Sequence, residues 1–117
     1  MIELGRDSFT VVRAPLVTDV RDNTQYRDWD NATSTVVTKA KVNPFELAEK
    51  LNFEINSERE YSRTGLKFYA PAGTSVEYTD RIEYQGRTYA VFGEPQVWTD
   101  FEGVQHHVEF VAQLRRG

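Results

Sequence analysis

The sequence predicts a mainly β fold: a small antiparallel β-barrel of about six strands, with long loops and at most one short helix. Short runs rich in β-branched and aromatic residues recur at fairly regular spacing between turn residues, which is typical of a barrel or sandwich. Aromatic residues make up 13% of the 117 residues, and Phe and Tyr dominate them, which favours strands. This length indicates one domain, 1–117, able to bury about two-thirds of its unfolded surface.

The first strand is expected at Phe9–Arg13, where the run FTVVR comes to an end before Pro15. Segment Thr18–Asn31 is dense in Asp, Asn and Arg. We expect a long ordered loop here, because Asp and Asn side chains hydrogen-bond to the nearby backbone. Tyr26 and Trp29 are expected to pin this loop onto the core.

A second strand is expected at Ser34–Val42, although its alternation is only partial. One face would carry Thr35, Val37, Lys39 and Lys41, and the other Val36, Thr38, Ala40 and Val42.

Segment Asn43–Glu60 allows two interpretations, and we treat it as a variable excursion from the barrel. Asn43 suits a helix N-cap, Pro44 the first helical position and Glu46 the third, so one or two helical turns can begin here. Phe53 and Ile55 alternate with polar residues, so the segment can equally form an extended strand.

The C-terminal half predicts four more strands, two of which form a well-defined hairpin. A strand at Arg63–Ala70 is followed by a Pro-Ala-Gly turn. The stretch DRIEYQGRTYAVFGEP then predicts two strands joined at Gln85-Gly86, with Gly93 and Pro95 ending the second. A last strand is expected at Gln105–Arg115. Its apolar face would carry His106, Val108, Phe110, Ala112 and Leu114.

Composition and motifs exclude several classes of protein. The formal net charge is −4, whereas a general nucleic-acid binder needs a basic face. Cysteine is absent, so disulfides and Cys-based zinc sites are excluded. Neither a signal peptide nor an apolar run of the ~20 residues that span a bilayer is evident.

Catalytic signatures are also missing from the sequence. No nucleophile elbow, P-loop or dinucleotide fingerprint is present. His106 and His107 are adjacent, and neighbours in a strand face opposite sides, so we expect them not to chelate one ion. The sequence therefore predicts no enzyme, cofactor or metal site.

The excursion is the candidate binding segment, because acidic and apolar residues interleave in it. To bind a partner, or to face the lumen of an assembly, the excursion would use Phe45, Glu46, Leu47, Glu49, Leu51, Phe53, Glu54 and Ile55. The alternative is a helix that caps one end of the barrel.

Four segments carry a resemblance to a known family. They are RAPLVTD-x-x-DN-x-x-x-RDW (Arg13–Trp29), FYAPAGT (Phe68–Thr74), DRIEYQGRTYAVFGEPQVW (Asp80–Trp98) and the closing HHVEFVAQLRRG. Together they resemble the head-to-tail connector, or head closure ("stopper"), proteins in the neck of siphophages. The excursion at 43–60 departs from the pattern, since that stretch is typically a variable insertion.

The resemblance implies a structural protein of the virion neck, made in the cytoplasm of the bacterial host. Twelve or six copies would form a ring beneath the portal and its adaptor and above the tail terminator or tail tube. The ring would close the channel after DNA packaging and let DNA pass without sequence-specific binding, away from any membrane. The long loop can supply the ring contact, through Asp19, Arg21, Asp22, Tyr26, Arg27 and Trp29.

Other functions remain open at this point. A head–tail adaptor or tail-terminator would fill a neighbouring place in the neck, but adaptors are usually more helical. An OB-like barrel for single-stranded nucleic acid would use exposed aromatics along a basic groove, and the negative net charge counts against it.

Overall fold

The computed structural model describes residues 4–46 and 64–115. Antiparallel strands make up nearly all of its regular structure, and one 3-10 turn is the helical element of this part of the chain. In order, the elements are β1 (Asp7–Arg13), β2 (Leu16–Thr18), β3 (Gln25–Arg27), η1 (Trp29–Asn31), β4 (Thr33–Glu46), β5 (Thr64–Pro71), β6 (Arg81–Tyr84), β7 (Arg87–Thr99) and β8 (Gln105–Leu114).

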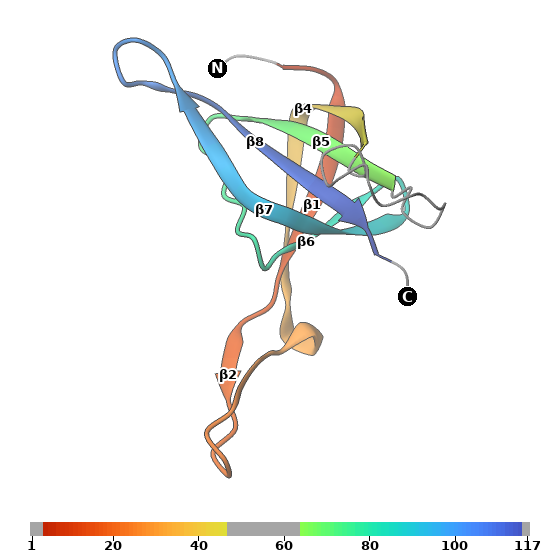
Figure 1. Cartoon of the computed structure of the whole chain (residues 1–117), viewed down its shortest axis with the longest axis vertical. Coiled ribbons are helices and arrows are strands. Elements are labelled where there is room, and N and C mark those ends of the chain that lie inside the picture. Colours follow the sequence, from red (N-terminus) through yellow and green to blue (C-terminus); the bar gives the residue numbers. More distant parts are fainter. Residues whose placement is uncertain (1–3, 47–63, 116–117) are drawn as a thin grey trace, which may run out of the picture.

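Six of these strands close into a barrel, which confirms the predicted fold class (Figure 1). The order around the barrel is β1-β4-β5-β8-β7-β6, and β6 pairs with β1 to complete it. Every neighbouring pair is antiparallel. Closure removes most of the open sheet edge, which would otherwise be a site of unwanted pairing.

The core fills the barrel with side chains from alternate strand positions. Phe68 lies at its centre, stacked on Phe110 with ring centroids 4.8 Å apart and meeting Phe9 edge-on at 5.0 Å. Aromatic pairs of this kind stabilise a core beyond the burial of their area. The buried cluster is Phe9, Val11, Ala40, Phe68, Ala70, Ile82, Tyr89, Val108, Phe110 and Ala112.

The predicted faces of the second strand are wrong, because β4 contains a bulge. Between the pairs Asp7↔Ala40 and Phe9↔Val37, β4 advances three residues while β1 advances two. Lys39 adopts a positive φ of 60° at this point. One extra residue moves the following side chains to the other face of the sheet. Val37 therefore packs against the core before the bulge, and Ala40 is buried after it.

Of the two interpretations of Asn43–Glu60, the extended one holds for residues 43–46 and the helix start is wrong. The backbone at Asn43 and Pro44 is extended and pairs with Lys67 and Leu66 of β5. The ladder with β5 satisfies the backbone groups that a helical turn would have used internally. Residues 47–63, the rest of the excursion and the strand start at Arg63, lie outside the described residues.

The predicted β6–β7 hairpin is confirmed at its turn. Gln85 and Gly86 have φ values of 52° and 79°, the positive angles that a tight two-residue hairpin turn requires. The predicted end of the second strand at Gly93 and Pro95 is wrong, because β7 continues to Thr99. Both residues lie in an irregularity where β7 takes four steps, Phe92 to Gln96, against two on β8. There Pro95 interrupts the ladder without ending it.

Segment Thr18–Asn31 is more regular than the predicted loop. β2 and β3 pair with each other through Leu16↔Arg27, Val17↔Tyr26 and Thr18↔Gln25. They form a separate two-stranded sheet that projects from the barrel between β1 and β4 (Figure 1). We call this hairpin, residues 16–27, the arm.

Candidate interaction surfaces

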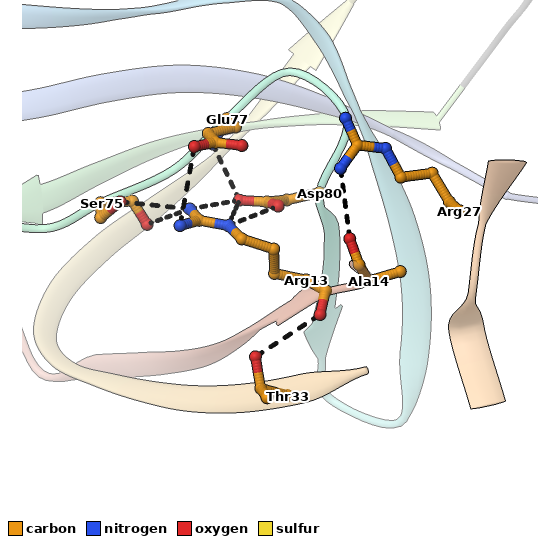
Figure 2. A network of polar contacts seen from close by, with 7 residues as sticks. All are labelled: Arg13, Ala14, Arg27, Thr33, Ser75, Glu77 and Asp80. Carbon is orange, nitrogen blue, oxygen red and sulfur yellow. Dashed lines mark hydrogen bonds and ion pairs between the residues drawn. The ribbon is translucent and has the colours of Figure 1, made fainter. Parts of the chain in front are cut away.

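The base of the arm is fixed by a polar network around Asp80 (Figure 2). Asp80 is 2% exposed and lies just before β6. Arg13, the last residue of β1, donates from Nε to Oδ1 of Asp80 at 3.0 Å and from Nη2 to Oδ2 at 2.8 Å. The backbone N–H of Glu77 donates to Oδ2 at 2.8 Å, and Arg13 Nη2 also donates to the Ser75 hydroxyl at 3.1 Å. This bidentate pair orients Arg13 where the arm begins.

Three further contacts fix the base of the arm. The N–H of Asp28 donates to the carbonyl of Pro15 at 2.9 Å. Arg27 Nη1 donates to the carbonyl of Ala14 at 3.2 Å. The guanidinium of Arg81 lies 3.7 Å from the ring centroid of Trp29, a cation–π distance. Both strands of the arm are therefore anchored where they leave the barrel.

The tip of the arm is ordered by its own short polar side chains, as the sequence predicts. Asp19 accepts from the backbone N–H of Arg21 at 2.9 Å, and Asp22 accepts from the Thr24 hydroxyl at 2.8 Å. The side-chain hydrogen bond from Arg21 lowers the pKa of Asp19, and that from Thr24 lowers the pKa of Asp22. Both carboxylates therefore stay ionised at neutral pH.

Apolar side chains on the arm face solvent. Val20 is 90% exposed, and Leu16 and Tyr26 are each about half exposed. Tyr26 therefore does not pin this segment onto the core as predicted, because the arm projects beyond the reach of the barrel. Trp29 contacts the barrel through Arg81 at the start of β6, which is not part of the buried core.

The predicted ring-contact residues all lie on the arm or at its base. Asp19, Arg21 and Asp22 form the tip, Tyr26 and Arg27 belong to β3, and Trp29 opens η1. Of the predicted lumen residues, Phe45 and Glu46 end β4. Leu47, Glu49, Leu51, Phe53, Glu54 and Ile55 lie outside the described residues.

A second hairpin, residues 96–107 of β7 and β8, extends past the barrel on another side (Figure 1). Asp100 orders its turn by accepting from the N–H groups of Glu102 and Val104, each at 2.9 Å. Phe101 is fully exposed at the tip, and Val97, Trp98 and Val104 are about half exposed. Exposed apolar residues grouped in this way mark interaction sites.

The expectation that His106 and His107 face opposite sides is wrong. Between Trp98↔His107 and Thr99↔Gln105, β8 advances two residues against one on β7, so His106 is an extra, bulged residue. The Nδ1 atoms of the two rings lie 2.7 Å apart and can share one proton. His107 Nε2 lies 2.8 Å from Glu109 Oε2, and Lys67 Nζ lies 3.2 Å from the other oxygen.

These contacts predict a pH-dependent contribution from Glu109. Burial raises the pKa of Glu109, but hydrogen bonds from His107 and Lys67 outweigh burial, so this pKa lies below its usual value of 4.5. A depressed folded-state pKa stabilises the fold above the unfolded pKa, and this stabilisation is lost as the pH falls through the folded value. Thermal melts between pH 7 and pH 3 should therefore show a smaller acid-induced decrease for Glu109→Gln than for the wild type. Glu94→Gln, an exposed control, should keep the wild-type dependence, and identical curves for all three proteins would contradict the assignment.

A surface groove of about 460 Å³ runs between the first half of β4 and the turn after β5. Arg13 and Lys39 line it, together with Val36 and Val37 of β4 and residues 71–75. The groove therefore joins the base of the arm to the outer side of β4.

Sequence reasoning missed Val20, Trp98, Phe101 and the Asp80 network. Two of them have a recognisable signal: Val20 and Phe101 both follow Thr-Asp and precede a charged residue. A large apolar side chain at such a polar turn has no intramolecular cover, which indicates a contact surface.

Comparison with family models and with curated proteins returned no match to this chain. Within residues 4–46 and 64–115, no three His, Asp or Glu side chains are grouped to hold a metal ion. The same part of the chain contains no helix long and apolar enough to cross a membrane.

Proposed function

We propose that the chain is a ring-forming subunit of a phage neck, a head-to-tail stopper that closes the portal channel after packaging and presents a platform for the tail. The observation that carries this proposal is the pair of ordered hairpins, the arm and the β7–β8 hairpin. Each projects from a closed barrel and exposes apolar side chains that the described part of the chain leaves uncovered. A subunit that contacts two different neighbours needs two such surfaces.

Ring assembly requires two different contact surfaces on each copy. A contact between two different patches of identical chains is heterologous, and it closes into a ring when the rotation is right. Each protein–protein face typically buries ~800 Å² per partner, which a projecting hairpin supplies more easily than a bare barrel wall. The ordered tips also limit the entropy lost on assembly.

The partners follow from the place in the neck. The portal or its adaptor would lie above the ring and the tail terminator or tail tube below it, with DNA passing through the channel. A net charge of −4 suits this passage, because like charges repel the phosphate backbone. We place the acidic excursion at 43–60 toward the lumen or the tail. The resemblance in four segments and the absence of catalytic signatures support a structural role.

The test is to block expression of the gene in the phage that encodes it and to image the lysate by negative-stain electron microscopy. We expect separate tails beside heads that have lost their DNA, with intact virions restored when the wild-type gene is supplied in trans. Separate tails beside DNA-filled heads would replace the stopper with an adaptor or other joining protein. Intact virions without the gene product would overturn the neck role and favour the OB-like alternative, which salt-dependent binding of single-stranded DNA would then establish.

A further inference from the structure

The first half of β4 has an open main-chain edge. Residues 33–37 pair with β1, as in Thr33↔Arg13 and Val37↔Phe9, but pairing with β5 starts only at Lys41. In an antiparallel ladder, alternate residues direct their N–H and C=O groups to opposite neighbours. No described residue supplies a main-chain partner to the outer side of 33–39. The barrel is therefore closed at one end of β4 and open at the other.

This edge lacks most of the protection that natural edge strands carry. Such strands are usually blunted by charges, proline or bulges along their length. The sequence here is TSTVVTK, with one charge, at Lys39, where the bulge lies. The side chain of Val36, in the middle, is 66% exposed. An uncharged, β-branched open edge is a template for an added strand.

The groove beside this edge has room and charge for the side chains of an added strand. It is about 460 Å³ in volume and includes Val36 and Lys39. Lys39 is exposed, and no described carboxylate forms an ion pair with it. The site therefore favours an extended segment that carries both apolar and acidic side chains.

We infer that the open edge of β4 receives the arm of a second copy of this chain, an inference that rests on the proposed ring. The arm is already extended and has free outer edges, because β2 and β3 pair only with each other. It exposes Val20 and Tyr26 for the groove. Its Asp22 has no cationic partner among the described residues, and its negative charge is complementary to the positive charge of Lys39.

The polarity of this contact agrees with ring formation. The donor is the arm and the acceptor is the β4 edge, so after a pair has formed one copy keeps a free edge and the other copy keeps a free arm. Such a contact adds copies in one direction until the ring closes. Because the arm leaves the barrel beside β4 (Figure 1) and is anchored there by Arg13, its direction is set by the same strands that form the acceptor.

Cross-linking between single-cysteine variants tests the contact cleanly, because the chain has no cysteine of its own. Val20→Cys carries a thiol on the arm and Val36→Cys one on the edge, and the two proteins differ in a size tag. A short bismaleimide should give at least ten times more mixed dimer from this pair than from Val104→Cys with Val36→Cys. Val104 is similarly exposed, at 59% against 66% for Val36, but lies on the β7–β8 hairpin. Circular dichroism checks that all three variants remain folded.

The experiment is run on concentrated purified protein and in infected cells that express both variants. Equal yields from the arm–edge and control pairs in both settings would overturn the inference, whatever the imaging of the blocked phage shows. An arm–edge product together with intact virions in the blocked phage would retain the contact and overturn the neck role. For a second measurement, the edge thiol is moved to Thr38→Cys and cross-linked to Val20→Cys. Adding Val36→Lys to the Thr38→Cys protein should lower the yield of this mixed dimer at least tenfold. An unchanged yield would contradict the edge as acceptor.

Discussion

Replacing Phe68 with alanine is expected to lower the free energy of unfolding by about 4 kcal/mol, within the range for buried Phe→Ala substitutions. Phe68 is fully buried and contacts four aromatic rings, those of Phe9, Phe110, Tyr84 and Tyr89. The substitution removes a large apolar side chain and leaves a cavity in the middle of a closed barrel, whose hydrogen-bonded wall cannot move inward to fill it. Urea unfolding followed by far-UV circular dichroism measures the change.

Two further variants make this result interpretable. Phe101→Ala removes the same side chain from the exposed tip of the β7–β8 hairpin and should change the unfolding free energy by less than about 0.5 kcal/mol. Since a domain of this kind has only about 5–15 kcal/mol of stability, Phe68→Leu provides a milder core change that keeps the protein folded. A Phe68→Ala effect no larger than that of Phe101→Ala would mean that Phe68 does not lie at the centre of the core.

The core of the barrel could be predicted because it depends on local alternation. In β8 the predicted apolar face is buried at Val108, Phe110 and Ala112, whereas His106 at its start is exposed. In β6, Ile82 of the predicted hairpin is fully buried. A strand directs every second side chain inward, so an uninterrupted alternating run fixes which face meets the core. The Gln85-Gly86 turn was equally predictable, since few residues adopt two successive positive φ values.

Bulges account for most of the errors in the fold. Lys39 has no sequence signal for a positive φ, yet its bulge reverses the faces of β4. Gly93 and Pro95 are normally strand breakers, but the two extra residues on β7 at this point let the ladder with β8 resume at Gln96. A further bulge, in β8, brings the side chains of His106 and His107 together. A bulge is decided by the register between two strands, which is a tertiary property and not a local one.

The candidate interaction surfaces also combine local features, which the sequence indicates, with long-range contacts, which it does not. The segment that forms the arm could be recognised as an ordered projection from its Asp and Asn residues, which are local features, but the exposure of Val20 and Tyr26 was not predicted. The anchor of the arm could not be recognised, because Arg13 and Asp80 are 67 positions apart and each is an ordinary charged residue in the sequence. Only closure of the barrel between β1 and β6 brings them together.

This anchor gives the second large prediction. Asp80→Ala is expected to lower the free energy of unfolding by about 3 kcal/mol, at the low end for breaking a buried ion pair. The Asp80 side chain is 1% exposed, and its loss leaves the Glu77 N–H and the Arg13 guanidinium without their acceptor. Arg13 donates to Asp80, which raises the pKa of Arg13. An arginine stays charged without such a partner, so in the variant its guanidinium must be hydrated in place. Its side chain is 34% exposed, and partial access to water is the reason for choosing the low end of the range.

A double-mutant cycle with Arg13→Ala separates the pair from the rest of the network. If the two side chains act mainly on each other, the double variant should be less destabilised than the sum of the single variants, with a coupling energy of about 2 kcal/mol. Asp19→Ala is the matched control, because Asp19 also pairs with an arginine, Arg21, but on the exposed arm, and its urea midpoint should not change. Additive effects of Arg13→Ala and Asp80→Ala would show that the carboxylate acts through the Glu77 turn alone. In that case the arm would depend for its position on the contacts of Arg27, Asp28 and Trp29.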